Sequence, residues 1–258
     1  MRLVHKLFLA WGICLASLAL GCPAAQAGGG PLEGPWEFSV APYGWLMGIS
    51  DEVTVRGQRA SVNVDFGDIW DALDFAGELH LEVMKGRLGL FLDPSYLKVS
   101  VENSLGPLNL DTTLEVTLFE YGAFYRVYRT SLAGPGREFA VDVLAGGRYW
   151  DLNVDIGLPR RTVSGDQSWT DPFVGARLAF SLTENWLFRL RGDVGGFGVG
   201  SDSAWQAIAL VEYRLANWAG VVVGYRALYT DYADGSGRDE NAFDATIHGP
   251  VVGVNFWF

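Results

Sequence analysis

The chain has 258 residues, among them 33 glycines and 14% aromatic residues, and its formal net charge is −11. An acidic balance of this size disfavours binding to nucleic acid, which is itself an anion. Both cysteines, Cys14 and Cys22, lie near the N-terminus, so the rest of the chain has no thiol for disulfides, cysteine metal sites or thiol catalysis.

The N-terminal segment predicts a cleaved signal peptide over residues 1–27. Two basic residues precede an apolar run of about 14 residues, and the small-x-small sequence Ala25-Gln26-Ala27 follows. The run is too short for a comfortable membrane-spanning helix. Lipid attachment at Cys22 is an alternative that the preceding residues fit poorly. Cleavage would leave one domain, 28–258, with 17 basic and 30 acidic side chains and a formal charge of −13.

The remaining chain alternates apolar and polar residues over segments of membrane-strand length, and it has no further apolar run of about 20 residues. Strands are expected near 36–48, 74–84, 87–101, 111–129, 137–153, 168–182, 185–198, 203–215, 218–232 and 243–258. The longer connections fall mainly at 49–73, 102–110, 154–167 and 233–242, and short turns alternate with them. This pattern is typical of an all-β, transmembrane antiparallel β-barrel. We expect ten strands, with eight or twelve as alternatives.

The first long connection contains acidic residues at threefold spacing, with apolar residues between them. As a short helix, the segment would be acidic on one side. One interpretation is a lid over the barrel mouth or a cation-binding surface between lipopolysaccharide phosphates, and the other is a solvated loop helix that caps the apolar rim. The residues of this loop are Asp65, Asp68, Trp70, Asp71 and Asp74.

In two later predicted strands, the alternation of apolar and polar residues indicates which face points inward. Within 111–129 the apolar face changes after Leu118, which predicts a β-bulge or a strand top that stands clear of the membrane. Within 185–198, Trp186 and Phe188 alternate with Arg189, and the polar face of the strands favours Arg over Lys. That preference suits a crowded barrel interior.

Assigning the polar faces to the interior predicts a lumen charge network with nearly balanced sign. An unpaired buried charge costs several kcal/mol, and the planar guanidinium of arginine can bond two carboxylates, so such a balance indicates packed ion pairs. The predicted members are Glu37, Glu78, Glu82, Asp93, Glu120, Asp142, Arg126, Arg148, Arg177, Arg189, Arg191, Asp193, Glu212, Arg214 and Arg226.

Two histidines follow the signal segment, His80 and His248. His80 lies on the inward face between Glu78 and Glu82, where it is either a polarised base or a lumen histidine held by two carboxylates. His248 is expected to face outward. With no G-x-S-x-G motif, no catalytic, cofactor or metal site is assigned, and a rim-site enzyme is only a minor alternative.

The stretches GDIWDALDFAG, LGLFLDPSYLKVS, DPFVGARL, RLRGDVGGFGVGSD and HGPVVGVNF, with the terminal Phe258, resemble small bacterial outer-membrane β-barrel-domain proteins of a poorly characterised branch. The resemblance covers the chain after the signal segment and carries no assigned reaction. It implies location in the outer membrane, contact with its lipid and lipopolysaccharide, and Phe258 as part of the signal to the barrel-assembly machinery.

Two functions remain open at this point. The first is a structural or surface-interaction barrel with a charge-filled, mostly plugged lumen. The second is a narrow, porin-like channel for small solutes, in which the same charges would line a water-filled path. The sequence does not identify a ligand, a substrate, a surface partner or an oligomeric state.

Overall fold

The computed structural model describes residues 31–55, 58–64, 67, 73–105, 108–158, 161–235 and 241–258, so the predicted signal segment lies outside it. Its strands are β1 (Trp36–Trp45), β2 (Gly48–Val55), β3 (Gln58–Val64), β4 (Leu73–Lys85), β5 (Leu88–Leu105), β6 (Leu108–Ser131), β7 (Glu138–Leu158), β8 (Arg161–Ser181), β9 (Trp186–Gly195), β10 (Ser203–Ala216), β11 (Ala219–Asp234) and β12 (Asn241–Trp257). In this part of the chain, no helix is long and apolar enough to cross a membrane.

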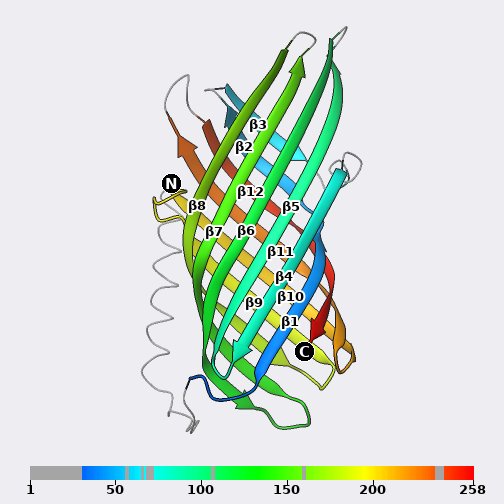
Figure 1. The fold of residues 1–258 in the computed structure, drawn as a ribbon, viewed down its shortest axis with the longest axis vertical. Helices are drawn as coiled ribbons and strands as arrows, with labels where there is room; N and C mark the ends of the chain where they lie inside the picture. Colours follow the sequence, from blue (N-terminus) through cyan, green and yellow to red (C-terminus); the bar gives the residue numbers. More distant parts are fainter. Residues whose placement is uncertain are drawn as a thin grey trace. The chain divides into compact units, whose positions relative to one another are not determined.

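Ten of these strands, β1 and β4–β12, close into an antiparallel barrel (Figure 1). Each neighbours the next in chain order, and closure comes from β1, which pairs with both β4 and the second half of β12. The ten-strand prediction is therefore confirmed. The hairpin β2–β3 is an addition to the barrel, because β2 pairs with the first half of β12 over Ala242–His248. This hairpin lies in a segment that the sequence analysis assigned to a loop.

The lower end of the barrel in Figure 1 contains tight turns between long strands. The turn between β4 and β5 uses Gly86, whose φ of +61° is a left-handed conformation that favours glycine. A Cβ atom there would lie only 2.6 Å from the backbone oxygen of Glu33 and 2.9 Å from that of Pro31. The segment before β1 thus packs directly against this turn, where Arg87 N donates to Pro31 O at 2.9 Å.

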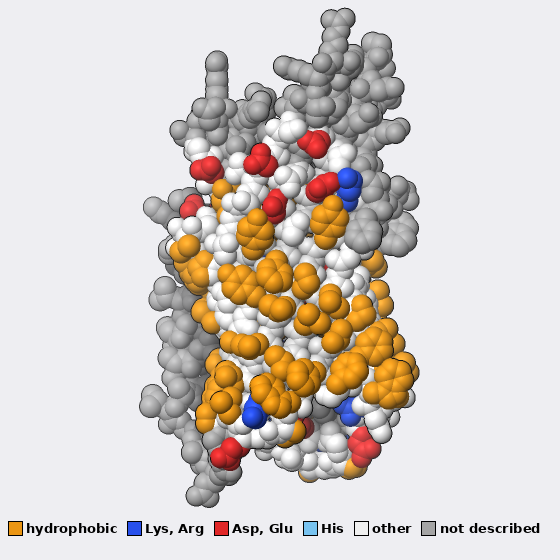
Figure 2. Space-filling model, in the orientation of Figure 1, with side chains coloured by type: hydrophobic (Ala, Val, Ile, Leu, Met, Phe, Trp, Pro, Cys, Tyr) orange, Lys and Arg blue, Asp and Glu red, His pale blue; other side chains and the backbone are white. Residues whose placement is uncertain are grey.

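The outward face of the barrel is apolar. Leu90, Leu190, Val223 and Val252, from four different strands, are each at least 50% exposed, and Figure 2 shows such side chains as a broad band below a more acidic upper region. Closed barrels satisfy every backbone hydrogen bond and can therefore span lipid. A closed barrel with an apolar outer band and a polar interior is the architecture of bacterial outer-membrane proteins, and the chain is a protein of that membrane.

Aromatic residues gather on the outside near the lower rim. Trp186 stacks at a tilt against Tyr213 with ring centroids 4.7 Å apart, and the ring of Trp218 stacks on that of Phe256 at 6.0 Å. Trp36, 58% exposed, lies at the start of β1, level with the β4–β5 turn. Indole and phenol rings favour the interface between lipid and water, so these residues mark one edge of the membrane band.

The hairpins β5–β6 and β7–β8 are longer than predicted, and the predicted loops at 102–110 and 154–167 are wrong. Strand pairing continues to Leu105 opposite Leu108, and to Leu158 opposite Arg161. Below these tips, the strands are apolar inside and polar outside, the reverse of a membrane-facing wall. For example, Lys98 and Glu115 form an outward ion pair at 2.7 Å, while apolar neighbours on the same strands are buried inside.

The predicted change of apolar face after Leu118 in β6 arises because the interior of the barrel becomes apolar at this height. Val116, Leu118 and Glu120 all point inward, and the pairing of β6 with β5 is regular through this point. The bulge predicted near the change is therefore wrong there, and the only irregularity of the described β6–β7 ladder lies lower, between Arg126 and Tyr128. The interior itself changes from polar to apolar, which agrees with the alternative of a strand top above the membrane.

Candidate functional site

Two rows of cross-strand partners bring the interior charges together. A strand places alternate residues on one face, so charges two residues apart on one strand reach the interior at successive heights. In the upper row, facing Cα partners on β5, β6, β7 and β8 are Asp93, Glu120, Arg148 and Asp171. In the lower row, facing partners on β6, β7, β8 and β9 are Arg126, Asp142, Arg177 and Arg191.

Glu120 is the centre of the upper row. Its side chain is fully buried and accepts from Arg148 Nε at 2.9 Å, Arg191 Nη2 at 2.9 Å and Arg226 Nη2 at 2.7 Å. The amide of Gln206 also donates to it, at 3.3 Å. One carboxylate thus joins strands β6, β7, β9, β10 and β11 across the lumen. Such convergence offsets the high cost of burying a charge away from water.

Asp193 on β9 completes this upper cluster. It accepts from Arg148 Nη2 at 2.8 Å and from Gln206 Nε2 at 3.1 Å, and it forms an ion pair with Arg191, whose Nη2 lies 2.9 Å away. The oxygen of the same Gln206 side chain accepts from Arg226 Nε at 2.7 Å. Each charged or amide side chain of this cluster therefore has more than one partner, and residues from several strands together fix its position. We call the buried set Glu120, Asp193, Arg148, Arg191, Arg226 and Gln206 the charge layer.

A second cluster lies next to the charge layer and spans the barrel from β4 to β8. Arg177 bonds Glu82 through Nη1 at 2.5 Å and Asp142 through Nη2 at 2.9 Å, and Arg126 Nε donates to the same Asp142 at 2.8 Å. Glu82 and Arg177 are 95 positions apart in sequence. The contact therefore depends on closure of the barrel and not on local structure.

His80 is held by Asp93 and Glu82. Its Nδ1 lies 2.8 Å from Asp93 Oδ2, and its Nε2 lies 3.6 Å from Glu82 Oε2. The hydroxyl of Tyr43 donates to the other Asp93 oxygen at 2.5 Å. The predicted neighbour Glu78 has another role, because its carboxylate accepts from the backbone N–H of Trp45. The sequence pattern thus placed His80 inside but assigned one wrong partner, since Asp93 reaches it from the next strand.

A third group lies on the side of β9, β10 and β12. Arg189 Nη1 contacts Glu212 Oε2 at 3.1 Å, and Asn255 Nδ2 donates to the same oxygen at 3.0 Å. Ser39 Oγ in turn donates to Asn255 at 2.7 Å and so reaches across the β1–β12 closure. Ser39 and Asn255 were not among the predicted network residues, although both share the inward parity of their strands.

Aromatic rings pack against the arginines of the lumen. The guanidinium of Arg177 lies 4.3 Å from the ring centroid of Phe124, and that of Arg226 lies 4.5 Å from the ring of Trp45. Cation–π contacts of this kind are more favourable where water is excluded. Room for Phe124 comes from Gly89 on β5, where a Cβ atom would lie 2.1 Å from the ring. The inward glycines therefore let large rings enter a crowded interior.

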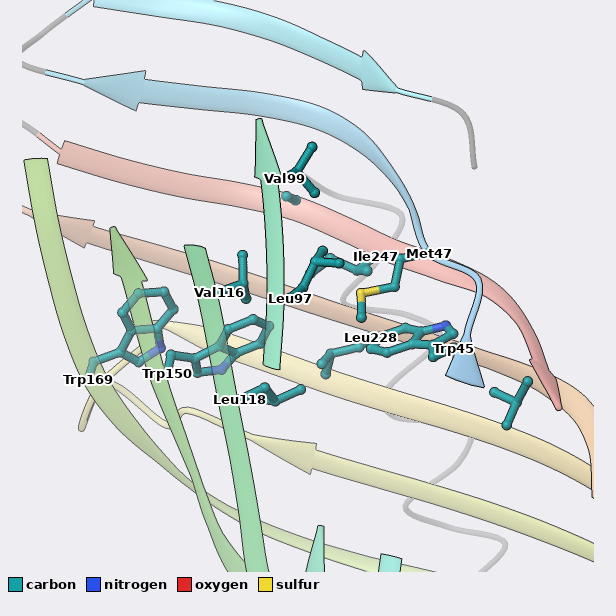
Figure 3. Packing of buried hydrophobic residues seen from close by; sticks show 12 residues of the cluster. Trp45, Met47, Leu97, Val99, Val116, Leu118, Trp150, Trp169, Leu228 and Ile247 are labelled. Carbon is teal, nitrogen blue, oxygen red and sulfur yellow. The ribbon is translucent and has the colours of Figure 1, made fainter. Parts of the chain in front are cut away.

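A cluster of buried apolar side chains lies inside the barrel (Figure 3). Leu118, Trp150 and Leu228 each lie two residues nearer the upper end of their strands than Glu120, Arg148 and Arg226, so one layer begins where the other ends. We call this cluster the apolar layer; its buried members are Trp45, Met47, Leu97, Val99, Val116, Leu118, Trp150, Trp169, Leu228, Ala245, Ile247 and Val251.

The aromatic side of the apolar layer joins β8 to its neighbour β7 and also to β11, with which it shares no hydrogen bonds. Trp169 on β8 stacks on Tyr232 of β11 with ring centroids 4.1 Å apart, and on Trp150 of β7 at 5.5 Å. The shorter strands β9 and β10 end below this level, at Gly195 and Ser203. Side-chain stacking therefore continues the closure of the barrel where these two strands have ended.

The loop between β9 and β10 is fixed to the interior by Asp171. Its carboxylate accepts from Ser201 N at 2.6 Å, from Ser201 Oγ at 2.8 Å and from Trp169 Nε1 at 3.1 Å. Ser201 Oγ also lies 2.7 Å from the Thr230 hydroxyl. Asp171, Ser201 and Thr230 are almost fully buried, and none was predicted from sequence. Asp171 and Thr230 have the inward parity of their strands, whereas Ser201 lies in the loop and has no such signal.

The remaining predicted residues lie at the lower mouth or outside the described side chains. Glu37 and Arg214 are exposed, and Arg214 lies over the ring of Trp257 at 5.0 Å. The backbone N–H and C=O of Phe258 both bond Phe38. Among the described residues, no group of three or more His, Cys, Asp or Glu side chains is arranged to hold a metal ion. The predicted lid, Asp65, Asp68, Trp70, Asp71 and Asp74, falls where no side chain is described.

The outward histidine lies on the lipid-facing side. His248 Nδ1 lies 2.7 Å from the hydroxyl of Tyr225, and their rings stack with centroids 6.2 Å apart. Tyr225 is 47% exposed on the outer wall. His248 is therefore separate from every interior cluster described above.

No known protein-family model matches the chain, and no curated protein matches it. Among solved structures, the attachment invasion locus protein Ail of Yersinia pestis is 10% identical, with 87% of this chain and 100% of that chain covered and a TM-score of 0.39. Neisserial surface protein A is 12% identical, with 86% and 99% covered and a TM-score of 0.36. The translocator domain of NalP from Neisseria meningitidis is 14% identical, with 98% and 95% covered and a TM-score of 0.40.

Proposed function

We propose that this protein has a structural or surface-interaction role in the outer membrane and that its own side chains close the lumen. One observation carries the proposal, namely that two different layers fill the interior in succession. The charge layer joins five strands through Glu120, and the apolar layer begins two residues nearer the upper end of the strands. An ion entering from below would meet the paired charges first and the apolar layer second, and an ion entering from above would meet them in the opposite order.

The surface supports the same proposal. The outer wall offers an apolar band to membrane lipid, and the long hairpins β5–β6 and β7–β8 stand above it with a polar outer face. Lipid and lipopolysaccharide are the partners that such a wall would contact, and the barrel-assembly machinery is the partner that the terminal Phe258 would address. His80, the histidine considered as a base, is engaged by Asp93 and Glu82, which favours a role without catalysis.

The test is single-molecule conductance of the protein purified from outer membranes and reconstituted in a planar lipid bilayer. We expect no reproducible conductance steps above the detergent background. A porin reconstituted in parallel controls for insertion, and the shift in gel mobility on heating shows that the silent protein is folded.

Reproducible steps would overturn the closed lumen and establish the second candidate, a narrow small-solute channel. In that case Arg191→Ala should shift ion selectivity towards cations, because it removes a positive charge from the path. In a closed barrel, the same change mainly lowers stability.

A further inference from the structure

A cavity of about 110 Å³ lies inside the lumen, next to the charge layer. Most of its wall is apolar and comes from both sides of the barrel, including Leu144, Ile208 and Leu210. Half of the polar residues in the wall are arginines, namely Arg177, Arg189, Arg191 and Arg226, and the others are Tyr43, His80, Asp93 and Asn255. An apolar chamber with cationic groups on its wall is suited to a small amphiphilic anion.

Most of the carboxylates that pair with these arginines do not line the cavity. Arg177, Arg189, Arg191 and Arg226 form ion pairs with six carboxylates in all. Of those six, only Asp93 lines the cavity. The cavity therefore meets the positive ends of the ion pairs, and its local potential is positive although the surrounding network is nearly balanced in charge.

Two of the four arginines, Arg191 and Arg189, have N–H groups for which no hydrogen-bond partner is described. Arg191 is nine-tenths buried, with a side chain 10% exposed, and its Nε–H has no hydrogen-bond partner among the described residues. A buried donor without a partner is costly, and because this nitrogen has almost no accessible surface, a ligand oxygen would reach it only with a small movement of the Arg191 side chain. Arg189 has one carboxylate contact, to Glu212 at 3.1 Å, and its side chain is 29% exposed.

We propose that this cavity binds a small organic monocarboxylate. The two carboxylate oxygens would take donors from Arg191 and Arg189, because a guanidinium matches a planar carboxylate in geometry and charge. The hydrocarbon part would lie against Leu144, Ile208 and Leu210. At about 110 Å³, the cavity is smaller than an engineered cavity of roughly 150 Å³ that holds benzene. The ligand is therefore an acid of about three or four carbons.

The test uses propionate as the probe and propionamide as a neutral control of nearly the same shape. Binding to the purified protein in a zwitterionic detergent is measured by saturation-transfer NMR with a concentration series. We expect propionate to bind at least tenfold more tightly than propionamide. Equal binding of the two compounds would overturn the proposal, because the cavity would then recognise only the apolar part.

The site is located by a pair of matched variants. Arg191→Lys keeps the charge but removes the guanidinium fork, and we expect propionate to bind about tenfold more weakly. Arg126→Lys makes the same change at a residue that pairs with Asp142 but does not line the cavity, and it should leave propionate binding unchanged. Equal losses in both variants would overturn the assignment, because attraction by overall charge would then explain the binding.

Heat-modifiability on gels identifies variants that fail to fold. If Arg191→Lys does not fold, Arg189→Lys replaces it, since Arg189 is the more exposed of the two and Asn255 also bonds its partner Glu212. Unchanged propionate binding by folded Arg189→Lys would again overturn the site. Conductance and binding are independent readouts, so failure of this proposal is distinguishable from failure of the closed-lumen proposal.

Discussion

At the scale of single residues, each buried charge of the charge layer is stabilised by more than one oppositely charged or hydrogen-bonding partner. Glu120 accepts from three arginines, and each of those arginines has at least one further partner. A buried ion pair contributes little net stability compared with apolar residues of the same volume, because desolvation offsets the attraction. Removal of one partner is a different matter, since it leaves the opposite charge buried and uncompensated.

We therefore expect Glu120→Ala to lower the free energy of unfolding by about 3–5 kcal/mol, because three guanidiniums would lose a shared carboxylate. The measurement is urea unfolding of the protein in lipid vesicles, followed by tryptophan fluorescence. The matched control is Glu138→Ala, which breaks the exposed pair with Arg129 near the lower rim and should cost about 1 kcal/mol or less. Equal losses in the two variants would contradict a special role for burial.

At the scale of strands, alternation predicted the barrel well because it depends only on which face each residue occupies. The inward parity of Arg189, Arg191 and Asp193 on β9 is what the structure has, and so is the outward parity of Trp186 and Phe188. Parity does not specify partners, because these depend on register between strands. His80 shows this, since Asp93 reaches it from β5.

The dependence on face also explains why the ends of the long hairpins, at 102–110 and 154–167, were predicted as loops. Above the membrane, the two faces exchange character, so Val116 and Leu118 point inward while the outer face becomes polar. The sequence prediction assumed that apolar residues face outward along the whole strand. Under that assumption, the exchange of faces predicts a bulge, and the strand ends resemble loops. The β2–β3 hairpin was missed because its pairing with β12 is nonlocal.

Among the connections, the β9–β10 loop gives the clearest test. Asp171 bonds the backbone and the hydroxyl of Ser201, and Gly200 packs so closely that a Cβ atom would lie 2.6 Å from Asp171 Oδ1. We expect Asp171→Ala to release residues 196–202, with at least a tenfold faster cleavage of this loop by an added protease. The control is Asp202→Ala in the same loop, whose side chain is exposed and which should leave the cleavage rate unchanged.

Intact protein and fragments are resolved on denaturing gels after a time course, and mass spectrometry locates the cut. If Asp171→Ala and the parent protein are cleaved at the same rate, the buried carboxylate does not restrain the loop. Cleavage elsewhere in the barrel would instead indicate general unfolding.

At the scale of the whole molecule, the closed-lumen proposal rests on two layers that are built differently, the charge layer and the apolar layer. Paired charges fill the lower level, and stacked side chains such as Trp150 and Trp169 fill the level above it. Each layer excludes water by a different means, one by complementary charge and the other by packing. Loss of one layer should therefore leave the other in place.

This independence predicts the outcome of combined truncations. Trp150→Ala with Trp169→Ala empties part of the apolar layer, and Glu120→Ala with Arg148→Ala empties part of the charge layer. We expect each pair alone to remain silent in planar bilayers and the combination of all four changes to give reproducible conductance steps. The pairs are matched in number and come from neighbouring strands, so they compare one layer with the other.

Two controls establish that a silent variant is present and folded. Heat-modifiability on gels shows folding, and quantification of the protein in the reconstituted membranes shows insertion. Conductance in the Trp150→Ala, Trp169→Ala protein would mean that the charge layer alone is permeable to ions. Conductance in the Glu120→Ala, Arg148→Ala protein would mean that the apolar layer alone is permeable to ions. Silence of the folded fourfold variant would place the barrier elsewhere in the lumen, because both layers would then have been opened without effect.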